Sequence, residues 1–249
     1  MTTTAVILAG GLGTRLRTVV SDVPKPMAPI HGRPFLEYLL DYWIAQGIKR
    51  FVLSIGYKYE IIVGHFGDSY KGVALDYVIE STPMGTGGGL LLAIQKIEAD
   101  TSFLVLNGDT YFAVNLQQLV QFAQENAADW CLSLFTTNNT ARYMGMDVLP
   151  EGEIKSLTPK KEQLSCLANG GVYWVRQQAL MKNKIIPGDK ISLENDILSQ
   201  ALLSKQRLFG LAFHGIFIDI GVPDDYQRAA SLLNLNIRKY SDEATLVSN

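Results

Sequence analysis

The sequence predicts an α/β protein with a Rossmann-like, mainly parallel central sheet and helices on both of its faces. In the first half of the 249 residues, short apolar runs alternate with segments of helical periodicity. Such alternation is typical of parallel strands that are connected by helices. The second observation is a glycine-rich segment directly after the first apolar run, because the ligands of such sheets bind beyond the carboxyl ends of the strands.

The elements of the first half can be placed in chain order. The apolar run at residues 5–9 is the first strand. The segments expected after it are a helix over 34–46, a strand over 51–55, a helix near 59–66, a strand over 75–79, a helix over 90–97 and a strand over 103–106. The last of these helices places Leu90 and Ile94 on one apolar face. The last strand ends at Asn107-Gly108-Asp109, so that a carboxylate emerges at the carboxyl edge of the sheet.

Past Asp129 the pattern becomes richer in strands. We expect strands over 131–135, 146–149, 154–157 and 171–175, and then helices that open near Ser192 and Pro223. No clear linker separates the two halves. We interpret the second half as a smaller, strand-rich lid or substrate subdomain.

Composition and charge exclude several classes of protein. With 47% hydrophobic and 18% charged residues, the chain can bury a sizeable core and shows no sign of disorder. The 22 basic and 24 acidic residues form no block of one sign, which argues against a partner among the nucleic acids. No apolar run approaches the roughly 20 residues that cross a membrane. The N-terminal run also lacks the basic region of a signal peptide, so we expect a cytoplasmic protein without a membrane partner.

Cysteine and histidine residues provide no catalytic arrangement. Cys131 and Cys166 lie in apolar, strand-like contexts without CxxC spacing, and we expect buried thiols. His31, His65 and His214 are scattered, and we assign no chemistry to them. A Ser-His-Asp or Cys-His set for covalent catalysis is therefore not indicated.

The glycine-rich segment has the composition of an anion-binding loop. Gly10, Gly11 and Gly13 allow backbone N–H groups to approach a phosphate without interference from Cβ atoms. Leu16 stands where the dinucleotide fingerprint requires its third glycine, and Gly-Lys-Ser/Thr of the P-loop is absent. These differences argue against a Rossmann oxidoreductase and against a kinase-like P-loop protein.

Lys25 is the second part of the predicted phosphate site. It lies between Pro24 and Pro26, whose rings fix the backbone and make the lysine a positioned cation. The alternative is a tight strand-to-helix turn with Arg15 and Lys25 as solvated surface charges. The combination of loop, arginine and rigid lysine favours phosphate binding.

These motifs together resemble the signature of sugar-1-phosphate nucleotidyltransferases. The resemblance rests on Leu8-Ala9-Gly10-Gly11-Leu12-Gly13-Thr14-Arg15-Leu16, Pro24-Lys25-Pro26-Met27-Ala28-Pro29-Ile30 and Gly32-Arg33-Pro34-Phe35-Leu36. It extends over about residues 4–233. Within the family the chain most resembles D-glycero-D-manno-heptose 1-phosphate guanylyltransferases and their mannose-1-phosphate relatives. Arg17-Thr18-Val19-Val20 departs from the pattern of the glucose thymidylyl- and uridylyltransferases, which favours the heptose branch.

The resemblance implies an activity and a domain organisation. The activity is the transfer of a nucleoside monophosphate from a triphosphate to a sugar 1-phosphate, with release of pyrophosphate, for surface glycans such as lipopolysaccharide or capsule. We expect one nucleotidyltransferase domain over 1–240, with a nucleotide-binding part at about 1–135, a sugar-binding part at about 136–215 and a tail at 241–249. The sequence leaves open whether the protein forms a homo-oligomer.

The resemblance also implies the catalytic and nucleotide-binding residues. Arg15 and Lys25 hold the phosphates, and Asp109 and Asp219 are the magnesium ligands, since two carboxylates with phosphate oxygens and water suit Mg²⁺. An isolated aspartate before a turn is otherwise a cap or turn former. The nucleotide contacts implied are Leu8, Gly10, Gly11, Gly13, Glu80, Pro83 and Gly85.

Glu80 favours guanine as the base. The segment around it resembles the one that reads the base in the family, and guanine presents two adjacent donors that one carboxylate can accept. Uracil and thymine present one donor beside an acceptor and suit an amide better. The alternative is an ordinary solvated glutamate at the end of a strand.

The sugar-binding residues implied by the resemblance are Gly145, Asn169, Glu194 and Lys160. Ser192 is also a natural N-cap, and Glu194 in the first helical turn would favour the helix dipole without any ligand. Lys160 lies near the family's Phe-x-Glu-Lys motif, but the glutamate is missing here. A mannose- or glucose-1-phosphate nucleotidyltransferase using GTP, dTTP, UTP or CTP stays an alternative, and a catalytically silent nucleotide-sugar sensor is a further one.

Overall fold

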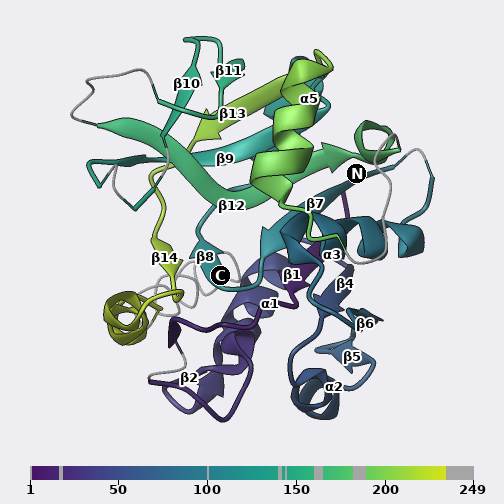
Figure 1. The fold of residues 1–249 in the computed structure, drawn as a ribbon, viewed down its shortest axis with the longest axis vertical. Coiled ribbons are helices and arrows are strands. Elements are labelled where there is room, and N and C mark those ends of the chain that lie inside the picture. Colours follow the sequence, from purple (N-terminus) through teal and green to yellow (C-terminus); the bar gives the residue numbers. More distant parts are fainter. Residues whose placement is uncertain are drawn as a thin grey trace, which may run out of the picture.

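A mixed sheet of ten strands forms the centre of the molecule (Figure 1). The computed structural model describes residues 2–16, 19–99, 101–139, 142–143, 145–159, 165–181 and 189–233. Along its main path the sheet has the order β11-β10-β12-β7-β1-β4-β6-β5, and β9 and β13 are joined to it beside β12. The predicted α/β class with a central, largely parallel sheet is confirmed.

The parallel part of the sheet comes from the first half of the chain. Its central strand β1 (Thr4–Ala9) pairs in parallel with β4 (Arg50–Ile55) and with β7 (Ser102–Asn107). Next to β4 lies β6 (Val73–Ile79), also in parallel, and the short antiparallel β5 (Ser69–Tyr70) closes that edge. The continuous apolar runs of these strands follow from burial on both faces.

Helices cover both faces of this parallel part, as predicted. One face carries α1 (Phe35–Ala45) and α2 (Tyr59–Phe66), whose apolar residues share a core with Ile7 of β1. The same core includes α4 (Leu116–Glu125), which packs against strands of the second half. On the opposite face lie α3 (Gly85–Ala93) with its continuation η3 (Ile94–Lys96), the π-helical turn η5 (Leu193–Leu198) and α5 (Ser199–Leu203). The alternation of Val6 and Ile7 between two cores reflects the two-residue period of a strand.

The strand-rich second half extends the same sheet. The long strand β12 (Cys166–Arg176) runs antiparallel to β7, with Trp174 opposite Leu104. Two further strands pair with β12, namely β9 (Trp130–Thr137) and β10 (Gly145–Val148). In turn, β9 pairs with β13 (Leu208–Ala212), and β10 pairs with β11 (Ile154–Ser156). The second half is therefore joined to the parallel part of the sheet through the pairing of β12 with β7.

Two predicted elements begin at different residues. The helix expected from residue 90 begins at Gly85. Its first turn is held by Ile191, whose carbonyl accepts from the N–H groups of Gly87 and Gly88. The contact is close, because a Cβ at Gly87 would lie 2.8 Å from Ile191 Cγ2. The strand expected from residue 171 begins at Cys166. The glycine pair at the expected start of the strand forms a bulge inside β12.

Short elements complete the described chain. They are the 3₁₀ turns η2 (Lys25–Met27) and η4 (Gln177–Leu180), the hairpin of β2 (Pro29–Ile30) and β3 (Arg33–Pro34), and the two-stranded ribbon of β8 (Thr110–Phe112) and β14 (Phe217–Asp219). A helix starts at residue 223 and continues to 233. Cys131 and Cys166 are buried and unlinked, as predicted. Among the described residues, no helix has the length and apolarity needed to cross a bilayer.

Candidate active site

The candidate site lies where the order of the parallel strands reverses. From β1 the sheet grows outward through β4 to β6, and the chain then crosses back through α3 to place β7 on the other side of β1. In the register of the sheet, Leu8 of β1 pairs with Asn107 of β7. The carboxyl ends of these strands meet at one edge, and open α/β sheets bind ligands at such a switch point.

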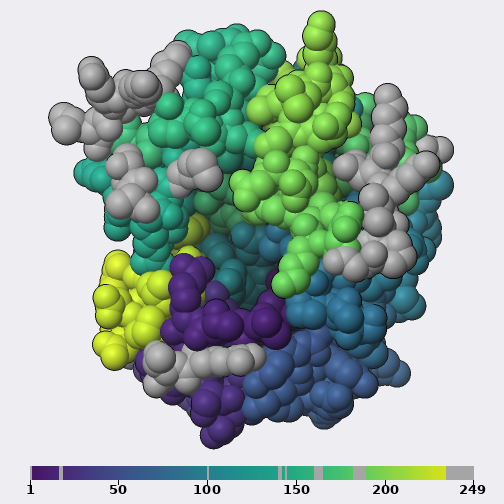
Figure 2. Space-filling view, in the orientation of Figure 1, coloured from purple at the N-terminus to yellow at the C-terminus, as the bar shows by residue number. Residues whose placement is uncertain are grey.

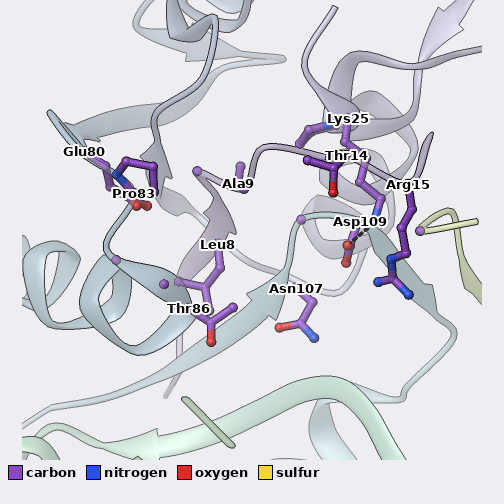
Figure 3. Close-up of a pocket in the computed structure, with 18 of the residues that line it drawn as sticks. Leu8, Ala9, Thr14, Arg15, Lys25, Glu80, Pro83, Thr86, Asn107 and Asp109 are labelled. Carbon is purple, nitrogen blue, oxygen red and sulfur yellow. Dashed lines mark hydrogen bonds and ion pairs between the residues drawn. The ribbon is translucent and has the colours of Figure 1, made fainter. Parts of the chain in front are cut away.

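A cavity of about 390 Å³ opens at this edge. Figure 2 shows the hollow between the purple N-terminal segment and the green segment that includes α5. Every residue predicted to contact the nucleotide lines it: Leu8, Gly10, Gly11, Gly13, Glu80, Pro83 and Gly85. Three predicted catalytic residues, Arg15, Lys25 and Asp109, line it as well (Figure 3). Thr86, Asn107 and Lys190 also line the cavity, although the sequence motifs did not single them out.

Two of the loop glycines are required by close approaches. A Cβ at Gly10 would collide with Oε1 of Glu80, so a larger residue would displace that carboxylate. Gly13 has a φ of +60° and its Cα lies against Lys25, where an added Cβ would be 3.1 Å from the lysine Cβ. The glycine loop therefore contacts Glu80 on one side and Lys25 on the other (Figure 3).

Lys25 is a positioned cation, as the flanking prolines predicted. It begins the turn η2, in which Met27 N–H donates to the Pro24 carbonyl at 2.8 Å. Its side chain is 11% exposed and its Nζ forms an ion pair with Asp109. The same Nζ lies 3.9 Å from Oδ1 of Asp219.

The ribbon of β8 and β14 brings the two distant aspartates together. Asp219 pairs with Thr110, the residue after Asp109, and Ile220 N–H donates to the Asp109 carbonyl at 3.0 Å. Gly221 N–H donates to Asp219 Oδ1 at 2.7 Å and orients that carboxylate. Both carboxylates consequently point to one position beside the glycine loop. The Lys25 ammonium group occupies that position.

Arg142 was missed by the sequence analysis. Its guanidinium donates to Asp219 Oδ2 at 3.3 Å, forms an ion pair with Asp225 and lies 4.8 Å from the centre of the Tyr143 ring. Nothing in the local sequence pattern indicates this role, because Asp219 and Asp225 are more than seventy residues away along the chain. The arginine adds a second positive charge beside the predicted metal ligand.

Glu80 is held at the other end of the cavity. Its carboxylate accepts hydrogen bonds from Ser54 Oγ at 2.9 Å and from Met84 N–H at 3.2 Å. Burial raises the pKa of this carboxyl group, and the two hydrogen bonds oppose the rise. A partly desolvated acceptor in a fixed orientation is suited to selecting between bases.

Two of the predicted sugar-binding residues are joined by a tyrosine. Asn169 Nδ2 donates to the Tyr173 hydroxyl at 2.6 Å, and that hydroxyl donates to Glu194 Oε1 at 2.8 Å. Ser192 also caps the following turn, because its Oγ accepts from Asn195 N–H at 3.1 Å. None of these residues is in the lining of the described cavity; they adjoin it through Asn107 and Thr86.

Gly145 and Lys160 are placed differently. Gly145 begins β10 opposite Ala168, and it packs where an added Cβ would lie 3.1 Å from Pro159 Cβ. It does not line the cavity, and its contact with the sugar stays a prediction. Lys160 and the tail at 241–249 fall outside the described residues.

The fold and the cavity define a nucleotide-binding α/β enzyme. The chain belongs to the nucleotidyl transferase family, whose model matches residues 4–235. It is 39% identical to the D-glycero-alpha-D-manno-heptose 1-phosphate guanylyltransferase of Aneurinibacillus thermoaerophilus, over 90% of this chain and 96% of that protein. The enzyme of the same name from Campylobacter jejuni is 38% identical, over 89% of this chain and 96% of its own length.

A solved structure shows the same similarity in three dimensions. HddC from Yersinia pseudotuberculosis, complexed with GMP-PN, superposes with a TM-score of 0.78 and 34% identity, covering 92% of this chain and 98% of its own. The resemblance of the sequence motifs to sugar-1-phosphate nucleotidyltransferases, and to the heptose guanylyltransferases in particular, is thus confirmed.

Proposed function

We propose that this protein transfers GMP from GTP to D-glycero-α-D-manno-heptose 1-phosphate, forming the GDP-sugar and pyrophosphate. The observation that carries the proposal is the single cavity in which the glycine loop, Lys25, Asp109 and Glu80 meet. One end of this cavity offers positive charge for phosphates and the other a carboxylate for guanine. The heptose guanylyltransferases among the relatives support the choice of substrates.

The reaction requires two anions to be held in line. An oxygen of the sugar phosphate attacks the α-phosphorus of GTP, the new P–O bond forms, and the bond to the bridging oxygen breaks as pyrophosphate leaves. The nucleophile is already ionised near neutral pH, so no general base is needed. Arg15 and Lys25 position the phosphates and offset their mutual repulsion.

Asp109 and Asp219 would hold a divalent cation, which we propose to be Mg²⁺. The ion pairs of both carboxylates with the Lys25 ammonium group support a site for positive charge between them. Within the described residues no third carboxylate, histidine or cysteine joins the pair, so phosphate oxygens and water would complete the shell. The bound ion would neutralise charge on the triphosphate.

Asn169 and Glu194 are proposed to bind the sugar, together with Gly145. An amide and a carboxylate are suited to sugar hydroxyls, because they supply both donors and acceptors. Glu194 is linked to the cavity through Thr86, whose hydroxyl donates to its carboxylate at 3.5 Å. A sugar phosphate whose phosphate faces Lys25 would extend its ring in this direction.

A substrate panel tests the proposed function. The purified protein is incubated with GTP, UTP, CTP or dTTP and with heptose, mannose or glucose 1-phosphate, and pyrophosphate is measured. We expect the highest kcat/KM for GTP with the heptose phosphate. A preference for mannose or glucose 1-phosphate, or for another base, would replace the proposed substrates; release of no pyrophosphate from any pair would contradict the reaction.

The Glu80→Gln variant tests how the base is selected. We expect kcat/KM for GTP to fall about tenfold relative to UTP, since an amide replaces the acceptor of two guanine donors. Because burial raises the pKa of Glu80, the KM of the wild-type protein for GTP should increase as the pH falls through that raised value. The variant should lack this increase.

The exposed Glu60 on α2 offers the control, Glu60→Gln, which should behave as the wild type in the same competition assay. Unchanged nucleotide ratios in Glu80→Gln would remove the base-reading role.

A further inference from the structure

Tyr173 is fully buried and stands at the junction of the two predicted halves of the site. It lies on β12 between Val105 of β7 and Leu132 of β9, and its exposed fraction is 0%. Its hydroxyl is hydrogen-bonded to Asn169 and Glu194, and Asn107 is a further polar neighbour. Burial and the nearby Glu194 carboxylate raise the pKa of the phenol well above its usual value, so the group stays a neutral donor.

A bulge in β12 makes this arrangement possible. In a regular strand, two side chains four residues apart are separated by about 13 Å. Here the register shifts between Asn169 and Tyr173, Gly171 takes a φ of +73°, and the Asn169 amide reaches the Tyr173 hydroxyl at 2.6 Å. Gly171 N–H donates to Asn169 Oδ1 at 3.0 Å, which fixes the other end of the same amide.

The tyrosine hydroxyl is used both as a donor and as an acceptor. A phenol has one proton to donate and two lone pairs to accept with. It donates to Glu194 and accepts from the Asn169 amide, and Asn107 lies nearby. Asn107 lines the nucleotide cavity, and its Oδ1 is buried without a partner among the residues the structure describes. Such an orphan acceptor beside a cavity is costly unless a ligand supplies a donor.

We propose that Tyr173 is a positioning residue for the sugar phosphate. Its hydroxyl fixes the orientation of Glu194 and Asn169 toward the sugar. The proposal rests on the proposed function, because it assigns the sugar to Asn169 and Glu194. Tyr173 itself touches no substrate and acts through these two side chains.

The Tyr173→Phe variant removes only the hydroxyl and tests the proposal. We expect KM for the sugar 1-phosphate to rise about tenfold, because the side chains lose a fixed partner. The KM for GTP should change less than about twofold, since the glycine loop and Glu80 are untouched. The two KM values and kcat are measured by pyrophosphate release with the best sugar phosphate of the substrate panel.

Tyr38→Phe is the matched control. Tyr38 is also a buried tyrosine, 5% exposed, whose hydroxyl donates to the Ile30 carbonyl at 3.0 Å. Tyr173→Phe loses two buried hydrogen bonds and Tyr38→Phe loses one, so both variants should lose thermal stability, but only Tyr173→Phe should change KM for the sugar phosphate. Equal KM effects in the two variants would show a general packing defect and overturn the proposal.

A double-mutant cycle with Glu194→Gln tests whether the tyrosine acts through the glutamate. If the tyrosine acts through the glutamate, the effects of the two substitutions on KM should be clearly less than additive. Additive effects, or an unchanged KM in Tyr173→Phe, would overturn the positioning role while leaving the proposed function intact. A wild-type protein that turns over no sugar 1-phosphate would contradict the proposed function instead.

Discussion

Alanine in place of Lys25 is expected to lower kcat by about 10²–10³, the range observed when one transition-state-stabilising donor is lost. Lys25 is held by two prolines at the end of the glycine loop, and its ammonium group is the cation to which Asp109 and Asp219 both turn. Without it, the negative charge that develops during transfer loses a preorganised partner. Steady-state turnover with saturating GTP and sugar phosphate measures the effect.

The control for this variant is Lys155→Ala. Lys155 pairs with Glu153 at 2.6 Å on the edge strand β11, and its loss should leave kcat unchanged. Thermal unfolding of both variants shows whether the unpaired carboxylates near position 25 have destabilised the fold. Near-normal turnover by a folded Lys25→Ala protein would refute the catalytic role of the lysine.

Asparagine in place of Asp219 should also lower kcat by about 10²–10³ and should raise the Mg²⁺ concentration needed for half-maximal activity. The amide keeps an oxygen that can accept from Gly221 N–H, so the turn after β14 should persist. Only the charge and one hard-oxygen ligand are lost. A titration of activity with MgCl₂ separates weakened metal binding from a lower maximal rate.

Asp76→Asn supplies the comparison for Asp219→Asn. Asp76 pairs with Arg50 at 2.8 Å on the parallel strands β6 and β4, away from the ribbon that carries Asp219. Its variant should show the wild-type Mg²⁺ dependence. If Asp219→Asn retained both the wild-type rate and the wild-type Mg²⁺ dependence, the proposed metal site would be wrong.

Local sequence determined much of this protein. The apolar run of β1, the glycines after it and the Pro-Lys-Pro segment were sufficient to predict an anion-binding loop at the end of a parallel strand. Alternating periodicities predicted the strands β1, β4, β6 and β7 and the helices α1 and α2 within a few residues, but they did not predict α4 or the short strand β8. These features depend on neighbours in the chain, because hydrophobic period, proline rigidity and glycine freedom are properties of short segments.

The tertiary structure alone decided how distant residues combine. Asp109 and Asp219 meet because β8 pairs with β14, and no periodicity in either short strand predicts that partner. Arg142 joins Asp219 and Asp225 for the same reason. Strand pairing is a choice among remote segments that are locally alike, so it becomes visible only in the fold.

The same distinction between local sequence and tertiary structure applies to the predicted sugar-binding residues. The sequence pointed to Asn169 and Glu194 separately, whereas the fold joined them through the hydroxyl of Tyr173. The glycine pair that looked like the start of a strand became a bulge that shortens β12 locally. Sequence therefore determined which chemical groups are present, and the long-range register of the sheet decided which of them touch, because register depends on contacts far apart in the chain.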